Sequence, residues 1–450
     1  MAPLTNDSSF IRGASPARVC ALAVVRRVFE EDAWADRALH AEAERLGLDA
    51  RDRALAVRLA YGTVQRKATL DHLIEAFARR PPDRLEPIVL AALRLGLYQV
   101  AYLDRVPAHA AVDTSVALAK EAGGPRAGGF VNAVLRRIGR LGNVETGAGA
   151  EPTAAALADA ASHPRWLVDR WLARFGPAET EALLRWNNTR PRLVLQPARE
   201  PAAELERRWR AEGIEVVPAP FGAGLVTDRT RPQDLPGYRE GAFLVQDPAQ
   251  ALLAWYADLA PDATLYDACA APGGKAITLG RAAGRVVAGD DNRARVRRLA
   301  VNLRRAGSGR EFAVVADALR PPVRPVDAVL LDAPCLGTGS FARHPDARWR
   351  VTPEALAMLA ERQAELLERA STVVAPGGLL VYGTCSLEPE ENQQQVDRFL
   401  ARHSDFRREP SDTFPAALTS AEGDLMILPQ RHQMDGAFAA RLRRAMRPIR

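Results

Sequence analysis

The sequence predicts an α/β protein whose C-terminal part is a doubly wound parallel sheet, preceded by an all-α domain and a small α/β connecting domain. Apolar residues recur every three or four positions between residues 15 and 140, which indicates packed helices. From Gly241 onward, short apolar strands alternate with helical segments, the pattern of a mostly parallel sheet. We expect the domain boundaries to lie at 1–145, 146–240 and 241–450.

Within the N-terminal part, the first helix is predicted to begin at Ser15 and Pro16, an N-cap residue followed by proline at the first helical position. Further helices are expected at 50–78, 85–103, 108–121 and 128–141. This part of the sequence contains no grouping of catalytic side chains. We therefore expect it to bind a partner rather than to perform chemistry.

The middle part begins with a predicted linker at residues 142–162, where apolar periodicity is lost and Gly, Ala and Thr accumulate. A helix is expected at 164–176, and short strands are expected at 192–197 and 214–218. Prolines interrupt the rest of this part. The pattern indicates a small α/β domain that connects the two larger ones.

The C-terminal part is predicted to contain five main strands. In doubly wound sheets, ligands bind at the carboxyl ends of the strands. The residues that follow these strands are therefore the first candidates for a functional site. The expected strands cover residues 264–269, 285–290, 312–316, 326–332 and 378–384.

Composition and charge limit the class of protein. A chain of 450 residues with 47% hydrophobic and 26% charged residues is typical of soluble proteins with two or three domains. Four cysteines are too few for a disulfide scaffold and indicate a reducing compartment. The N-terminus lacks the apolar core of a signal peptide, and the apolar stretch 87–103 is too short to span a membrane. We expect a cytoplasmic protein with no membrane partner.

The net charge of +6 is compatible with a nucleic-acid partner but does not identify one. Seven arginines fall within residues 293–310, and five more fall within 441–450. For either run alone, a solvated helix face is the favoured interpretation. The charge pattern therefore supports RNA binding only in combination with other features.

A glycine-containing loop follows the first predicted strand, in the stretch "DACAAPGGKA" at residues 267–276. It does not fit the P-loop that binds ATP, because Cys269 replaces the first glycine and Ala276 follows Lys275. The dinucleotide fingerprint fails as well. S-adenosylmethionine fits better, because it carries no phosphate and a less extensive glycine loop, such as that of Gly273 and Gly274, suffices for it.

Acidic residues follow three of the strands. Asp290 stands where a carboxylate can accept hydrogen bonds from both ribose hydroxyls, and Asp317 stands within reach of an adenine amine. Asp332 ends the fourth strand. Each acid alone could instead cap a helix. Three such acids at successive strand ends favour a methyl-donor site, although the neighbouring Asp291 leaves the ribose ligand open between two residues.

Two cysteines, Cys335 and Cys385, follow the fourth and fifth predicted strands, which are expected to be neighbours. A lone cysteine is usually buried and inert. A thiolate beside a cofactor can, however, add to an electron-poor ring carbon. We expect no metal, because the sequence has no CxxC pair or histidine cluster nearby. The residues alone do not decide which cysteine would attack.

Four motifs together resemble the RNA (cytosine-5) methyltransferases. They are "DACAAPGGK" at 267–275, "LLDAPCLGTG" at 330–339, "RHPDARW" at 343–349 and "YGTCSLEPEEN" at 382–392. The helical N-terminus, with "GGFVNAVLRRI" at 128–138, resembles the NusB-type RNA-binding domain. The combination is similar to the bacterial 16S ribosomal RNA cytosine-5 methyltransferases. It implies a Rossmann-like methyltransferase domain after a NusB-like domain.

The resemblance also implies roles for individual residues. Cys385 would attack C6 of cytosine, and Cys335 would assist release of the product, whereas DNA enzymes attack with the cysteine in the position of Cys335. Asp332 would hydrogen-bond N3 of the base, and Lys275 would contact the substrate or the donor. The implied site for S-adenosylmethionine comprises Cys269, Ala270, Ala271, Pro272, Gly273, Gly274, Lys275, Asp290, Asp317 and Asp332.

The implied partner is 16S ribosomal RNA, free or in an unassembled or partly assembled small subunit, bound by a monomer. A tRNA or 23S rRNA cytosine-5 methyltransferase shares every catalytic motif, and a non-catalytic RNA-binding factor is a third interpretation. Two departures from the family pattern are Ala276, where Ser or Thr is common, and 192–197, which lacks a common asparagine. The stretch 435–444 fits the closing strand of the family.

Overall fold

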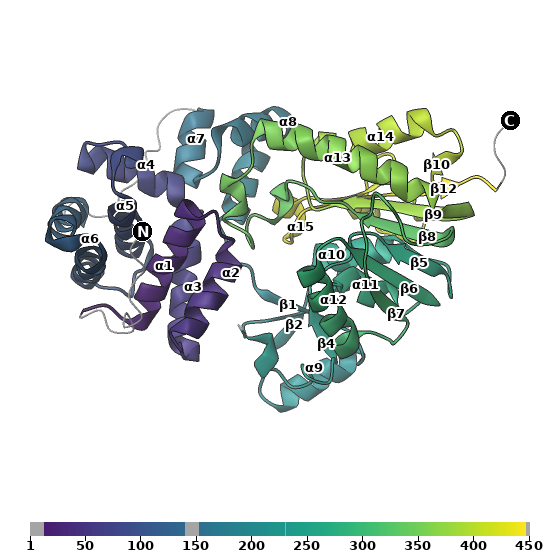
Figure 1. Cartoon of the computed structure of the whole chain (residues 1–450), viewed down its shortest axis with the longest axis horizontal. Coiled ribbons are helices and arrows are strands. Elements are labelled where there is room, and N and C mark those ends of the chain that lie inside the picture. The colour runs from purple at the N-terminus through teal and green to yellow at the C-terminus, as the bar shows by residue number, and fades with distance from the viewer. Residues whose placement is uncertain (1–12, 140–152, 230, 447–450) are drawn as a thin grey trace. The chain divides into compact units, whose positions relative to one another are not determined.

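The computed structural model describes residues 13–139, 153–229 and 231–446. The chain forms two compact units (Figure 1). The first comprises Met1–Asn188 and His344–Arg350, and the second comprises Thr189–Arg343 and Val351–Arg450. A short segment from the C-terminal half of the sequence therefore belongs to the N-terminal unit.

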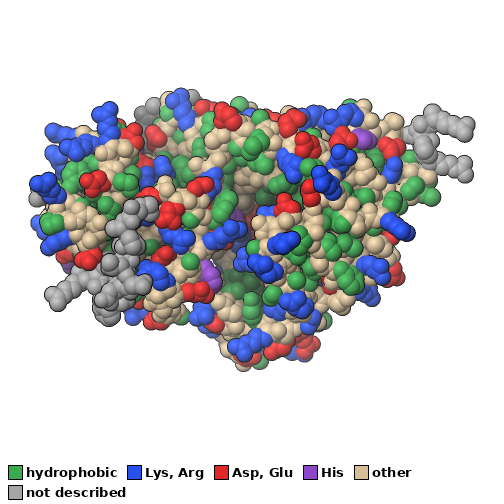
Figure 2. Space-filling view, in the orientation of Figure 1, with side chains coloured by type: hydrophobic (Ala, Val, Ile, Leu, Met, Phe, Trp, Pro, Cys, Tyr) green, Lys and Arg blue, Asp and Glu red, His purple; other side chains and the backbone are tan. Residues whose placement is uncertain are grey.

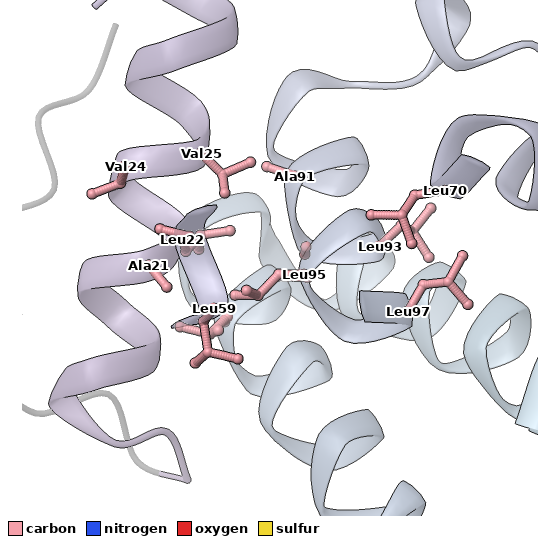
Figure 3. Close-up of a cluster of buried hydrophobic side chains, with 14 of the residues drawn as sticks. Ala21, Leu22, Val24, Val25, Leu59, Leu70, Ala91, Leu93, Leu95 and Leu97 are labelled. Atoms are coloured by element: carbon pink, nitrogen blue, oxygen red, sulfur yellow. The ribbon is translucent and has the colours of Figure 1, made fainter. Parts of the chain in front are cut away.

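The first unit is helical, as predicted. Its core is formed by apolar side chains from several helices, among them Leu22, Leu59 and Leu95, all fully buried or nearly so (Figure 3). Ser15 stands at the N-cap of the first helix, but its hydroxyl contacts Arg18 instead of a backbone N–H. The helices are α1 (Pro16–Glu30), α2 (Ala35–Arg45), α3 (Ala50–Gln65), α4 (Lys67–Ala78), α5 (Pro87–Tyr102), α6 (Ala108–Gly139), α7 (Ala154–Ala161) and α8 (Arg165–Asn187).

Two expected helix boundaries in this unit differ from the structure. The helix expected at 50–78 divides at Arg66 into α3 and α4. The two helices expected at 108–121 and 128–141 form α6, which is interrupted at Gly124, where φ is 82°. Glycine tolerates this backbone angle, so the chain changes direction there. Residues 140 and 141 lie outside the described residues.

The linker prediction for 142–162 was wrong over its second half. Residues Ala154–Ala161 form α7, and the hydroxyl of Thr153 accepts a hydrogen bond from the Ala156 N–H at 3.2 Å. Alanine has the highest intrinsic helix propensity, so an alanine-rich stretch without strong periodicity still forms a helix once it is capped. The remainder of the predicted linker, up to residue 152, lies outside the described residues.

The second unit contains a small antiparallel sheet in the strand order β2-β3-β1-β4. Its strands are β1 (Leu193–Pro197), β2 (Val216–Pro218), β3 (Leu225–Thr227) and β4 (Phe243–Val245), with α9 (Ala202–Ala211) packed beside them. Leu195, Leu205, Trp209 and Phe243 form its buried core. The strands expected at 192–197 and 214–218 are confirmed.

The large sheet has the order β10-β12-β9-β8-β5-β6-β7, with β11 beside β12. All five main strands predicted from the sequence are present and mutually parallel, and the expected closing strand is β12, which pairs with β9 in antiparallel fashion. The strands are β5 (Thr264–Asp267), β6 (Arg285–Asp290), β7 (Glu311–Val315), β8 (Val326–Asp332), β9 (Val374–Thr384), β10 (Phe406–Arg408), β11 (Leu425–Ile427) and β12 (Ala437–Arg444).

Helices cover both faces of this sheet (Figure 1), which confirms the doubly wound prediction. Successive residues of a strand point to opposite faces, so Leu330 packs with one helix layer and Leu331 with the other. One layer contains α10 (Pro248–Tyr256), α11 (Gly274–Leu279) and α12 (Arg293–Ala306). The other contains α13 (Pro353–Thr372) and α14 (Gln393–Arg402), and the short α15 (Pro429–His432) precedes β12.

The two arginine runs are partly structural. Arg305 of α12 donates to the carbonyls of Tyr238 and Phe243, and Arg443 of β12 pairs with Glu409. Basic and acidic side chains are interspersed over the visible surface (Figure 2). Within the described ranges, no helix is both long and apolar enough to cross a membrane.

Candidate active site

A pocket of about 370 Å³ lies at the carboxyl ends of the parallel strands in the second unit. The chain passes from β5 to β6 on one side of β5 and later enters β8 on the other, so the strand order reverses there. Ligands of doubly wound sheets bind at such a switch point. The pocket is lined by Ala268, Cys269, Ala271, Asp290, Asp291, Arg295, Ala316, Asp317, Ala318, Asp332, Ala333, Pro334, Cys335, Arg362, Leu366 and Cys385.

The loop after β5 supplies two of these lining residues, Cys269 and Ala271. Ala270 is buried, and the carbonyl of Pro272 accepts a hydrogen bond from the Asn302 side chain at 2.9 Å. Burial, followed by the nearby Asp267, raises the pKa of Cys269 to about 12, so this thiol stays protonated.

The two glycines of this loop pack against side chains, and Gly273 also has a backbone angle that favours glycine. Gly273 has φ of 107°, and a Cβ there would stand 2.7 Å from the Leu299 side chain. A Cβ at Gly274 would stand 2.8 Å from the Gln246 amide. Neither glycine lines the pocket. The close approach that these glycines permit is therefore with neighbouring side chains.

Asp290 and Asp291 end β6, but their surroundings differ. Asp290 is buried, and its Oδ1 accepts hydrogen bonds from the Asn292 N–H at 2.9 Å and from Arg295 Nε at 2.8 Å. The Asp291 side chain is 62% exposed and pairs with the same arginine at 2.7 Å. Asp317 follows β7, where its carboxylate accepts from the Leu319 N–H at 2.9 Å.

Lys275 does not line the pocket, but it pairs with Asp332, which does. The Lys275 ammonium donates to Asp332 Oδ2 at 2.6 Å and also contacts the Gln250 side-chain oxygen. Burial alone would lower the pKa of Lys275, but the charge and hydrogen bond of Asp332 raise it overall. Lys275 is therefore a buried cation held by a carboxylate.

Cys335 and Cys385 also meet, with their sulfur atoms 3.4 Å apart. In the parallel pairing of β8 with β9, Asp332 lies opposite Gly383, so the two strands end at the same edge of the sheet. The hydrogen bond to Cys385, followed by burial, raises the pKa of Cys335 well above its usual range. Cys335 therefore keeps its proton and can donate it to the sulfur of Cys385.

Sequence reasoning missed several polar residues around this site. Asp267 ends β5, and burial together with Asp332 raises its pKa to about 7. Asp267 stands near the end of a predicted strand, as the other acidic candidates do, so its position in the sequence could have identified it. Gln250 and Arg362 lie in helices with ordinary patterns, and nothing in the sequence marks them. Among the described residues, no cluster of His, Cys, Asp and Glu could hold a metal ion.

Three protein families match successive parts of the chain. Residues 15–140 match the NusB family, and residues 163–232 match the ferredoxin-like domain of RsmF/B-like methyltransferases. Residues 254–443 match the family described as 16S rRNA methyltransferase RsmB/F. The order of the three matches is the order that the sequence predicted for the helical, connecting and catalytic domains.

Whole-length relatives agree with these matches. The chain is 37% identical to the probable ribosomal RNA small subunit methyltransferase B of Synechocystis sp., over 95% of this chain and 99% of the relative. It is 32% identical to the Bacillus subtilis protein of the same description, over 95% and 98%. The ribosomal RNA small subunit methyltransferase B of Vibrio cholerae is 34% identical, over 87% and 89%.

Solved structures share the fold. The crystal structure of PH0851 superposes with a TM-score of 0.80 at 26% identity, covering 95% of this chain and 98% of that one. NSun6 from Pyrococcus horikoshii, solved with SFG, gives a TM-score of 0.57 at 19% identity over 63% of this chain and 98% of that one, which shows the fold alone. The chain belongs to the 16S rRNA methyltransferase RsmB/F family and is an S-adenosylmethionine-dependent RNA methyltransferase.

Proposed function

We propose that this enzyme methylates C5 of a cytosine in 16S ribosomal RNA through a covalent bond between Cys385 and C6 of the base. The observation that carries the proposal is the pair of cysteine sulfurs, 3.4 Å apart, beside the pocket at the strand ends. The names of the whole-length relatives support the small-subunit RNA as substrate.

The residues of the pocket fit S-adenosylmethionine, which supplies an electrophilic methyl group when bound. A volume of about 370 Å³ falls within the range of small-molecule sites. Among the described residues, the hydrogen bonds of Asp290 all fall on Oδ1, so Oδ2 can accept from ribose hydroxyls. Ala316, Ala318 and Leu366 offer an apolar wall for a purine ring.

Under this proposal the two cysteines act in sequence. Cys335 keeps its proton and can donate it in a hydrogen bond to the sulfur of Cys385, 3.4 Å away, and the thiolate of Cys385 is the nucleophile. The sulfur lone pair of Cys385 forms the bond to C6 as the C5–C6 π bond opens, and the displaced electron pair makes C5 nucleophilic toward the methyl group of the donor. Asp332, held by Lys275, is proposed to hydrogen-bond N3 of the base, which stabilises the adduct as charge develops on the ring.

Release then reverses the first bond. The C5 proton leaves to a base, its electron pair restores the C5–C6 double bond, and the C6–sulfur bond breaks to return the Cys385 thiolate. We assign the base to Cys335. While Cys385 is bonded to C6, it no longer shares a proton with Cys335. Cys335 first gives its own proton to water and then, as a thiolate, accepts the proton from C5.

The substrate can be tested by bisulfite sequencing of 16S, 23S and transfer RNA from a strain that lacks the protein. We expect one cytosine of 16S rRNA to lose its methyl group, and the wild-type gene but not the Cys385→Ala gene to restore it. Loss confined to 23S or transfer RNA would move the enzyme to the alternative substrate class. Unchanged methylation in all three would overturn the proposal.

A further inference from the structure

We propose that Gln363 and Glu391 form a buried clamp that positions Cys335 for product release, an inference that rests on the proposed covalent mechanism. Neither residue lines the pocket, and neither would touch the donor or the base. Both belong to the second unit, Gln363 in α13 and Glu391 in the 3-10 turn Pro389–Glu391. They are positioning residues, because they act through the peptide that carries Cys335.

The clamp holds the chain on both sides of Cys335. Gln363 Nε2 donates to the carbonyl of Pro334 at 2.9 Å, just before the cysteine. The Leu336 N–H, just after the cysteine, donates to Glu391 Oε1 at 2.9 Å. Gln363 Nε2 also donates to that same carboxylate oxygen at 2.9 Å, which joins the two anchors.

A tyrosine completes the network from the neighbouring strand. The hydroxyl of Tyr382 in β9 lies 2.6 Å from the carbonyl of Glu391 and 3.2 Å from Gln363 Oε1. Tyr382, Gln363 and Glu391 are all fully buried. The orientation of the glutamine amide is thereby fixed, with its oxygen toward the tyrosine and its nitrogen toward the cysteine turn.

Burying this carboxylate is costly. Burial raises the pKa of Glu391, while hydrogen bonds from Ser386, Leu336 and Gln363 lower it in part. An apolar side chain of similar volume would fill the same space without the desolvation cost. Two of these three hydrogen bonds bear on the turn that carries Cys335, because Leu336 belongs to that turn and Gln363 also holds the Pro334 carbonyl, which argues for a positioning role.

The nucleophile has anchors of its own. The carbonyl of Cys385 accepts a hydrogen bond from the Gly339 N–H at 3.0 Å, and the Leu387 N–H donates to the Thr338 hydroxyl at 2.8 Å. Removing the clamp therefore frees the Cys335 turn while these anchors keep holding Cys385. The expected defect is selective: attack and methyl transfer proceed, and release slows.

The test compares the single-turnover methylation rate, the covalent protein–RNA complex on denaturing gels and the thermal unfolding of each variant. Gln363→Leu and Glu391→Leu should transfer the first methyl group at nearly the wild-type rate, then release about 10- to 100-fold more slowly, the scale of an ångström of misplacement. Glu391→Gln keeps an acceptor for the Leu336 N–H and should restore release. Should Gln363→Leu fail to fold, Tyr382→Phe tests the same network by removing one hydroxyl.

Gln395→Leu is the matched control. Gln395 is also a fully buried glutamine, and it donates to a carbonyl of α13 at Ala360, away from the cysteine turn. It should lower thermal stability without trapping RNA. The clamp is overturned if Gln395→Leu traps RNA equally, or if Gln363→Leu slows methyl transfer and release alike.

Cys335→Ala separates the clamp from the mechanism on which it rests. If Cys335→Ala traps RNA and the two clamp variants do not, only the clamp is wrong. If Cys335→Ala accumulates no covalent complex, the proposed roles of the two cysteines are overturned, and the clamp loses its role with them.

Discussion

Replacing Asp290 with alanine should weaken the binding of S-adenosylmethionine without destroying the pocket. A hydrogen bond to a charged group contributes about 1.5–3 kcal/mol, so the loss of the ribose acceptor corresponds to a roughly 10- to 150-fold rise in Kd. Asp290 is buried, which keeps solvent screening low. Asp290→Asn retains an acceptor oxygen without the charge, so its Kd should lie between those of the wild-type protein and Asp290→Ala.

The neighbouring acid provides a matched control. In Asp290→Ala, Arg295 keeps its ion pair with Asp291, and in Asp291→Ala it keeps its ion pair with Asp290. Neither change leaves the arginine without a carboxylate. The Asp291 pair is solvent-exposed, and such pairs contribute at most about 1 kcal/mol. Asp291→Ala should therefore change Kd by less than about fivefold.

Isothermal titration calorimetry with S-adenosylmethionine measures these differences directly. Thermal unfolding without ligand provides the control for stability, because Asp290 also accepts from the Asn292 N–H at the start of α12. An unchanged Kd for Asp290→Ala, or equal losses for the two alanine variants, would remove Asp290 from the donor site and refute its assignment as the ribose ligand.

Four further predictions follow from the same structure. Cys335→Ala should accumulate a covalent RNA complex on denaturing gels and Cys385→Ala should not; the reverse pattern would make Cys335 the nucleophile. A variant lacking residues 1–145 should bind rRNA poorly, and binding by the whole chain should weaken steeply with salt; normal methylation by the shortened variant would contradict this. The pKa of Asp267 is higher in the folded than in the unfolded protein, so the free energy of unfolding should decrease as the pH rises from 3.8 to about 7. Asp267→Asn should remove this decrease in denaturant melts. Arg348→Ala should lower the unfolding free energy by about 3 kcal/mol, because this buried guanidinium donates to the Asn187 carbonyl at 2.7 Å and to Asn188 at 2.9 Å; an unchanged urea midpoint would contradict it.

The main strands could be predicted because each is a short apolar run that ends in a recognisable turn. Strands β3 and β4 could not, since three residues carry too little periodicity to distinguish a strand from a loop. The break between α3 and α4 at Arg66 has no proline or glycine to mark it. The two helices of α6 could be separated because Gly124 and Pro125 stand between them.

The positions of most site residues could be predicted because they stand at strand ends, but the side chains that contact them could not be predicted. Asp332 was visible because it ends an apolar run, but its partner Lys275 is 57 residues away in the sequence. The other partner of Lys275, Gln250, lies in an unremarkable helix. Gln363 likewise occupies an ordinary position in an amphipathic helix. Sequence periodicity locates elements, but contacts between elements depend on packing that no local pattern records.

The different roles proposed for the two cysteines have a structural basis in how each is held. Cys385 follows directly on β9, the strand that pairs with β8 and β12, and its carbonyl is fixed by Gly339. Cys335 lies three residues beyond β8, in a turn whose anchors are the side chains of Gln363 and Glu391. A nucleophile must meet a single ring carbon at a fixed distance, so continuity with a central strand suits it. A release base acts only after the adduct has formed, and it too must meet one atom, the C5 proton, so its turn needs the fixed hydrogen bonds that Gln363 and Glu391 provide in place of a strand.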